Sequence, residues 1–140
     1  MKDFTLYPEA FELKKLGFDE PCIGFYKLGD VDIYYDTIIQ EKNHKFRNNT
    51  GLNIYGDLKE KIAAPTYSQA FRFFRDKFNM PSKIEATFEH ETPNQYHYFY
   101  QIVTDDFVSG DGVMLNWTYE EAELACLKKL IEIVKTNEIS

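Results

Sequence analysis

The strongest constraint on the fold lies near the end of the sequence, where a helix start signal precedes a broad apolar stripe. Thr118 is a favourable N-cap residue, and Glu121, three residues later, completes a capping box. Apolar residues then recur at three- and four-residue steps over 120–134. The stripe consists of Leu124, Leu127, Ile131 and Val134, widened by Cys126, Leu130 and Ile133. A stripe this broad predicts a helix packed flat on a sheet.

Two further helices are predicted from signals of the same kind. Thr66 and Gln69 form a second capping box, and this helix must end before Pro81, because proline cannot continue a helix. Pro8 favours the opening turn of an earlier helix, and Gly17 fits a left-handed stop. The expected apolar faces are Ala70, Phe71, Phe74 and Phe78 for the later helix, and Leu6, Ala10, Leu13 and Leu16 for the earlier one.

Between the helices the sequence has the features of strands. Segments 22–26 and 31–35 flank a turn and predict one hairpin, and segments 84–89 and 96–103 predict a second. In the second hairpin, the alternation predicts a buried face formed by Ile84, Ala86 and Phe88. The sequence therefore predicts a single α+β domain over 1–140, in which about three helices pack on an antiparallel sheet of two hairpins.

Two stretches do not fit regular structure. Residues 36–64 form an irregular connection or insertion, in which 52–55 could be a short strand. Residues 105–112 are rich in Gly and Asp and predict a loop with several turns.

Composition and charge exclude several classes of protein. Apolar residues make up 44% of the chain, which favours a packed core over disorder. The net charge of −7 disfavours binding to duplex nucleic acid, because the phosphate backbone would be repelled. No apolar stretch is long enough to span a membrane. Cys22 and Cys126 lie in apolar segments and are expected to be buried thiols, although a disulfide between them stays open.

The sequence contains no recognisable catalytic or metal-binding constellation. It lacks a Gly-x-Ser-x-Gly elbow, a phosphate-binding glycine loop and a zinc-type spacing of Cys and His. The histidines His44, His90 and His97 are expected to be surface or half-buried residues, although His90 and His97 could approach each other across strands. We therefore predict a protein that is not an enzyme and holds neither a cofactor nor a metal.

Cations at two places stand out in this acidic chain. Residues 42–56 contain no acidic side chain, and Lys45 and Arg47 lie within them. Arg72 and Arg75 are three residues apart on a predicted helix, so they share one side of it. Guanidinium and ammonium groups in such positions can hold phosphate oxygens. The alternative is that both groups of cations are simply solvated.

Tyrosines form the other candidate feature. In the segment 96–103, Tyr96, Tyr98 and Tyr100 share one face, which could be a solvent-exposed surface that stacks a base. The alternative is that these rings cover a half-buried sheet, because tyrosine is common in strands. The predicted ligand-binding residues are Lys45, Arg47, Arg72, Arg75, Tyr98 and Tyr100.

Three blocks of the sequence resemble one family. They read LGFDEPC at 16–22, APTYSQAFRFFR at 64–75 and YEEAELACLKKLIEIV at 119–134. The same blocks, in the same order, resemble small accessory proteins of phages and prophages of gut Bacteroidetes. The segments 36–57 and 105–116 do not share this resemblance. It implies a phage accessory protein that acts in the cytoplasm of a host bacterium.

The resemblance and the residues together lead to two hypotheses. Phage accessory proteins often inhibit host defence, so the first hypothesis is a protein that sequesters a small anionic, nucleotide-like immune signal. A binding site shared between copies in a homo-oligomer would suit this role. The alternative is an inhibitor that binds a host defence protein through an acidic, tyrosine-rich surface.

Overall fold

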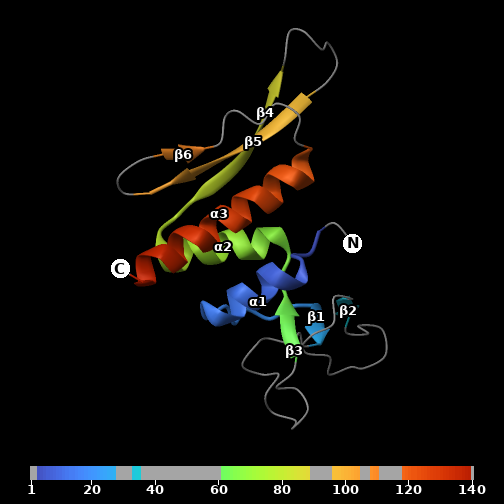
Figure 1. Ribbon diagram of the computed structural model, residues 1–140. Coiled ribbons are helices and arrows are strands. Elements are labelled where there is room, and N and C mark those ends of the chain that lie inside the picture. Colours follow the sequence, from blue (N-terminus) through green and yellow to red (C-terminus); the bar gives the residue numbers. More distant parts are fainter. Residues whose placement is uncertain are drawn as a thin grey trace. The chain divides into compact units, whose positions relative to one another are not determined.

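The computed structural model describes residues 3–27, 33–35, 61–88, 96–104, 108–110 and 118–139. The chain divides into two compact units, 1–70 and 71–140. The described residues form three helices and two antiparallel sheets of three strands each (Figure 1). The predicted α+β class is therefore confirmed. The two predicted hairpins are present, and each contributes to its own sheet.

The sheet of the first unit has the order β2-β1-β3. The central strand β1 (Gly24–Lys27) pairs with β2 (Ile33–Tyr35) as the predicted hairpin, and with β3 (Lys61–Ala64) on its other side. Strand β3 lies inside the stretch that we expected to be irregular, so that expectation is wrong for 61–64. Residues 36–60, including the expected strand at 52–55, lie outside the described residues.

Helix α1 (Tyr7–Lys15) packs on β3 and closes the core of the first unit. Its Ala10 lies against buried side chains of the sheet, with Tyr7 and Phe11 packed at the border. One cluster of buried side chains in this core consists of Ala10, Tyr26, Ile62 and Ala64. The Tyr26 hydroxyl donates a hydrogen bond of 2.6 Å to the Thr5 carbonyl.

Both ends of α1 follow from its sequence. Pro8 occupies the first turn, where an amide hydrogen is not required. At the other end Gly17 has φ of 96°, and the amide of Phe18 donates to the Leu13 carbonyl. These features form a Schellman motif, which a residue with a β-carbon disfavours. Leu6, expected on the apolar face, is 48% exposed, because it precedes the helix as its N-cap residue.

Helix α2 (Tyr67–Phe78) has the predicted capping box. The Gln69 amide donates to the Thr66 hydroxyl, and the Thr66 amide donates to the Gln69 side-chain oxygen at 2.9 Å. Asn79 has φ of 54° and ends the helix just before Pro81, as predicted. Helix α2 begins in the first unit and ends in the second.

The sheet of the second unit has the order β4-β5-β6. Strand β4 (Ser82–Phe88) pairs along its whole length with β5 (Tyr96–Val103), which also pairs with β6 (Val108–Gly110). Strand β6 lies inside the expected loop 105–112, so that expectation is wrong for 108–110. Residues 105–107 and 111–117 lie outside the described residues.

Helix α3 (Tyr119–Ile139) packs on β5 and β4, as its broad stripe predicts. Its capping box is present, since the Glu121 amide donates to the Thr118 hydroxyl at 3.2 Å and Glu121 accepts from the Thr118 amide. The helix continues five residues past the expected end at 134. The side chains that it buries are Ala122, Cys126, Leu127, Leu130, Ile131 and Val134.

The expected burial pattern of β4 is only partly correct. Ile84 is half-buried, but Ala86 is exposed, although both lie on the face predicted to be covered. Strand β4 is at the end of the strand order, so its side chains have a neighbouring strand on one side only among the described residues. An alternating sequence does not reveal whether a strand is central or at an edge.

Replacement of Gly17 tests the left-handed end of α1. We expect Gly17→Ala to lower the free energy of unfolding by about 1 kcal/mol, because a β-carbon is unfavourable at positive φ. Gly17→Asn should cost less, since asparagine tolerates this conformation better. Urea unfolding measured by circular dichroism gives both values. Equal stability of the alanine variant and the unchanged protein would contradict the Schellman end.

Candidate functional site

The solvent side of α2 carries the described part of the predicted site. The sequence of this helix puts apolar side chains on one side, where Ala70 and Phe74 are fully buried. Arg72 and Arg75 come from the opposite side, and both are exposed. They are separated by about one helical turn, so the prediction that they share one side of a helix is met.

The charge near Arg75 is partly balanced. Its Nε lies 3.0 Å from Oδ1 of Asp76, and the two side chains are 56% and 64% exposed. An ion pair with this exposure contributes between about 0 and 1 kcal/mol. A phosphate group could therefore replace Asp76 as the partner of Arg75 at small cost.

Lys77 is a third cation on α2, and it is not among the predicted ligand-binding residues. Lys77 is exposed, and its Nζ lies 5.4 Å from the ring centroids of both Phe73 and Phe78. These two rings meet edge to face at 5.5 Å. The spacing of Phe73 and Lys77, four residues apart on a helix, is the signal that could have identified the contact.

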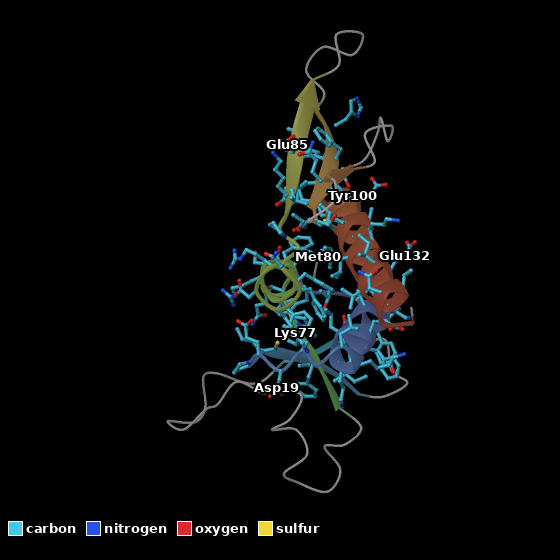
Figure 2. All side chains as sticks on the ribbon, turned by 90° about the vertical axis from the view of Figure 1, so that its left-hand side faces the viewer. Asp19, Lys77, Met80, Glu85, Tyr100 and Glu132 are labelled. Atoms are coloured by element: carbon cyan, nitrogen blue, oxygen red, sulfur yellow. The ribbon has the colours of Figure 1, made fainter. Side chains whose placement is uncertain are left out.

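Tyr98 and Tyr100 of β5 lie on the face that α3 covers. Tyr100 is 5% exposed, and Ile102 on the same face is fully buried. Figure 2 shows Tyr100 beside α3 and Glu85 on the opposite side of the hairpin. The expectation of a solvent-exposed tyrosine face is therefore wrong at Tyr100. Strand alternation indicates which residues share a face, but not which face a helix covers.

Tyr98 retains partial exposure and belongs to an aromatic pair. Its ring meets the ring of Tyr119 edge to face, with centroids 5.5 Å apart. Tyr119 opens α3 and is 45% exposed. Partial burial raises the pKa of Tyr119, and the carboxylates of Glu123 and Glu120 raise it further. Tyr119 therefore remains a neutral hydrogen-bonding group at neutral pH, beside acidic residues.

Two of the six predicted ligand-binding residues, Lys45 and Arg47, lie outside the described residues. The other four come from two elements of the second unit. Arg72 and Arg75 lie together on α2, and Tyr98 and Tyr100 lie together on β5.

The described histidine and both cysteines are buried, so their side chains are poorly accessible to a substrate. His97 is 5% exposed, so the expectation of a surface or half-buried residue is wrong. His44 and His90 lie outside the described residues. Cys22 and Cys126 are buried free thiols, as predicted, and they form no disulfide. Burial raises the pKa of each thiol to about 12, and nearby Glu20 and Glu123 add to the rise.

Comparisons of the chain with protein-family models, curated proteins and solved structures found no match. In the described part of the chain, no three His, Cys, Asp or Glu side chains are grouped so that they could hold a metal ion. No helix among the described residues combines the length and apolar character needed to cross a membrane.

The high thiol pKa values predict slow labelling in the folded protein. At pH 8 a thiol with a pKa of about 12 is ionised in about one molecule in ten thousand, and burial also blocks the reagent. We expect a disulfide reagent to label the cysteines of the folded protein at least about a hundredfold more slowly than those of the protein unfolded in guanidinium. The rate in the folded protein should be set by how often the fold opens. Absorbance of the released thiol measures both rates. Rapid labelling of either cysteine without denaturant would contradict its buried position.

Proposed function

We propose that this protein is a non-enzymatic binding protein that captures a small phosphorylated, nucleotide-like ligand, and that the solvent side of α2 supplies the cations. One observation carries the proposal. In a chain with a net charge of −7, the exposed residues Arg72 and Arg75 share one side of a helix in which Asp76 is the only acidic residue. This concentration of positive charge is the expected feature of an anion-binding surface.

A phosphate group is a better partner for the two arginines than the single carboxylate on their own helix. A guanidinium presents several donors in one plane and can form two parallel hydrogen bonds to a phosphate. The Arg75–Asp76 contact uses Nε of Arg75. Because Asp76 is more than half exposed, water can solvate its carboxylate once a phosphate has taken its place.

Lys77 lies two residues from Arg75 and therefore on a different side of α2, so it would contact another group of the ligand. Its position over the rings of Phe73 and Phe78 restricts the side chain before any ligand binds. A cation that is already restricted loses less conformational freedom on binding. The neighbouring phenyl rings also offer apolar surface to a base or sugar.

The resemblance of the sequence to phage accessory proteins supports an anti-defence role for such binding. A phage protein in the host cytoplasm that removes a nucleotide-like immune signal would need affinity but no chemistry. Lys45 and Arg47 are proposed to contribute further phosphate contacts, and Tyr98 to contribute a ring. Tyr100 is better suited to packing, because 5% exposure leaves almost no ring surface for a ligand.

The proposal is tested by titration with nucleoside monophosphates, nucleoside triphosphates, cyclic dinucleotides and inorganic triphosphate. We expect at least one to bind with a micromolar or lower dissociation constant, measured by isothermal titration calorimetry. Arg72→Ala and Arg75→Ala should each weaken binding about tenfold, because each removes a charged hydrogen bond.

Lys128→Ala is the matched control, because Lys128 is an exposed cation on α3. It should leave the dissociation constant within about twofold of the unchanged protein. Equal losses in all three variants would mean that only net charge matters, and would contradict a site on α2. Failure of every phosphorylated compound to bind would contradict the proposed function.

A specific observation also favours the second candidate function, inhibition of a host protein. The N-terminal part of α3 combines the half-exposed Tyr119 with Glu120 and Glu123, and the ring of Tyr98 lies against the ring of Tyr119. Exposed tyrosine beside acidic residues is suited to a basic protein surface.

The second candidate is tested with lysate of a bacterial host and tagged protein. If the tyrosine surface binds a host protein, Tyr119→Arg should abolish its capture, because the new cation opposes a basic partner. Lys128→Ala serves again as the control. The arginines of α2 are intact in Tyr119→Arg, and inorganic triphosphate has no base to contact Tyr98, so binding of inorganic triphosphate should be unchanged and separates the two functions. Capture that is equally strong with Tyr119→Arg would contradict this surface.

A further inference from the structure

Strand β4 presents a backbone edge in the second unit. It is the first strand of the order β4-β5-β6, and within the described ranges it pairs with β5 alone. An edge of this kind exposes amide and carbonyl groups that can pair with another strand. At seven residues, β4 is longer than the other edge strand, β6, which has three.

The pairing of β4 with β5 shows which backbone groups point to the open edge. The amide of Val103 donates to the carbonyl of Pro81, its partner across the ladder. Hydrogen-bonded pairs alternate along an antiparallel ladder, so residues 83, 85 and 87 also direct their backbone groups toward β5. Ser82, Ile84 and Ala86 therefore direct theirs away from β5, to the open edge.

The side chains along this edge combine apolar exposure with balanced charge. Ile84 is half-buried and Ala86 is exposed, both on the face that α3 partly covers. On the other face Lys83 and Glu85 form an ion pair with a separation of 2.7 Å. Their side chains are 56% and 38% exposed, so both can reach a neighbour at the edge.

We propose that β4 is a homodimer interface, at which it pairs antiparallel with β4 of a second copy about a twofold axis through Ile84. In this register the amide of Ile84 donates to the carbonyl of the partner's Ile84, and the partner's amide donates back to the carbonyl of Ile84. Ser82 bonds in the same way to the partner's Ala86. The two sheets thereby join into one continuous sheet, and the exposed alanine becomes covered.

The charges of Lys83 and Glu85 favour this register over registers in which the strands are shifted along each other. With the axis at Ile84, Lys83 lies opposite the partner's Glu85, and the two residues form a non-hydrogen-bonded pair. Such pairs bring their side chains closest together. With the axis at Lys83 or at Glu85, identical charges would lie directly opposite each other, which is unfavourable.

The lysine on this edge does not prevent pairing with another copy. Charged residues usually protect an edge strand, because an incoming strand does not neutralise them. Here the incoming strand has the same sequence in the opposite direction, so it supplies a glutamate opposite each lysine. The edge therefore discriminates in favour of a second copy over strands that lack this pattern.

Charge reversal tests the interface. By sedimentation velocity over a range of concentrations, we expect the unchanged protein to dimerise. Lys83→Glu and Glu85→Lys should each weaken the dimer at least about tenfold, because each places like charges opposite each other at two positions. An equimolar mixture of the two variants should recover dimers, since every facing pair is then of opposite sign.

Lys128→Glu on α3 is the control for the change in net charge, and it should dimerise as the unchanged protein does. Thermal unfolding of each variant verifies that the exposed substitutions leave the fold intact. A protein that stays monomeric up to about a millimolar would overturn the proposal. A mixture that fails to recover dimers while both variants are folded would also overturn it.

Disulfide trapping tests the register directly. Facing residues in a hydrogen-bonded pair have α-carbons about 5.5 Å apart, within the range that a disulfide spans. Ile84→Cys should therefore form a covalent dimer on mild oxidation, seen on a non-reducing gel. Lys83→Cys is the matched control. Its cysteine and the same cysteine of the partner would lie diagonally across the axis, farther apart than a facing pair, and should be trapped more slowly. Faster trapping of Lys83→Cys than of Ile84→Cys would overturn the proposed register.

Discussion

The packing of α3 on the β4–β5 pair decides what the second unit can present to a ligand. This helix buries a broad apolar face, and the strand face beneath it includes Tyr100 and Ile102. A large ring committed to that core cannot also stack a base. The chemistry available for binding is therefore displaced to the solvent side of α2, to the first turn of α3 and to the open edge of β4. Each of these regions has a different charge and suits a different kind of partner.

Features that depend on neighbours in the sequence were predictable. The capping boxes of α2 and α3 need two side chains three residues apart, so the sequence alone specifies them. Gly17 and Pro81 likewise act on the adjacent backbone. For the same reason, the shared side of Arg72 and Arg75 follows from helical spacing. Local chemistry thus gave the three helices, the two hairpins and the cationic part of the candidate site.

Features that depend on distant segments were not predictable in this way. Alternation places Tyr98 and Tyr100 on one face of β5, but the covered face is chosen by a helix that begins about twenty residues later. Ala86 fits a buried pattern, yet its strand is at an edge among the described residues. Strand β3 has too few residues to show a clear period, and it is stabilised by β1 from far along the chain. Tertiary pairing decides each of these cases.

The two proposals are physically compatible because they use separate residues and separate forces. Two copies with a net charge of −7 each repel at long range, and at physiological salt this repulsion is screened over about 8 Å. A dimer interface must therefore be locally neutral, as Lys83 and Glu85 make the edge of β4. A phosphate ligand meets the same long-range repulsion. Its binding site must therefore carry a local excess of cations, as α2 does, and not a neutral surface. Neutral backbone pairing would thus join the copies while each keeps its own anion-binding surface, so the expected stoichiometry is one ligand for each chain.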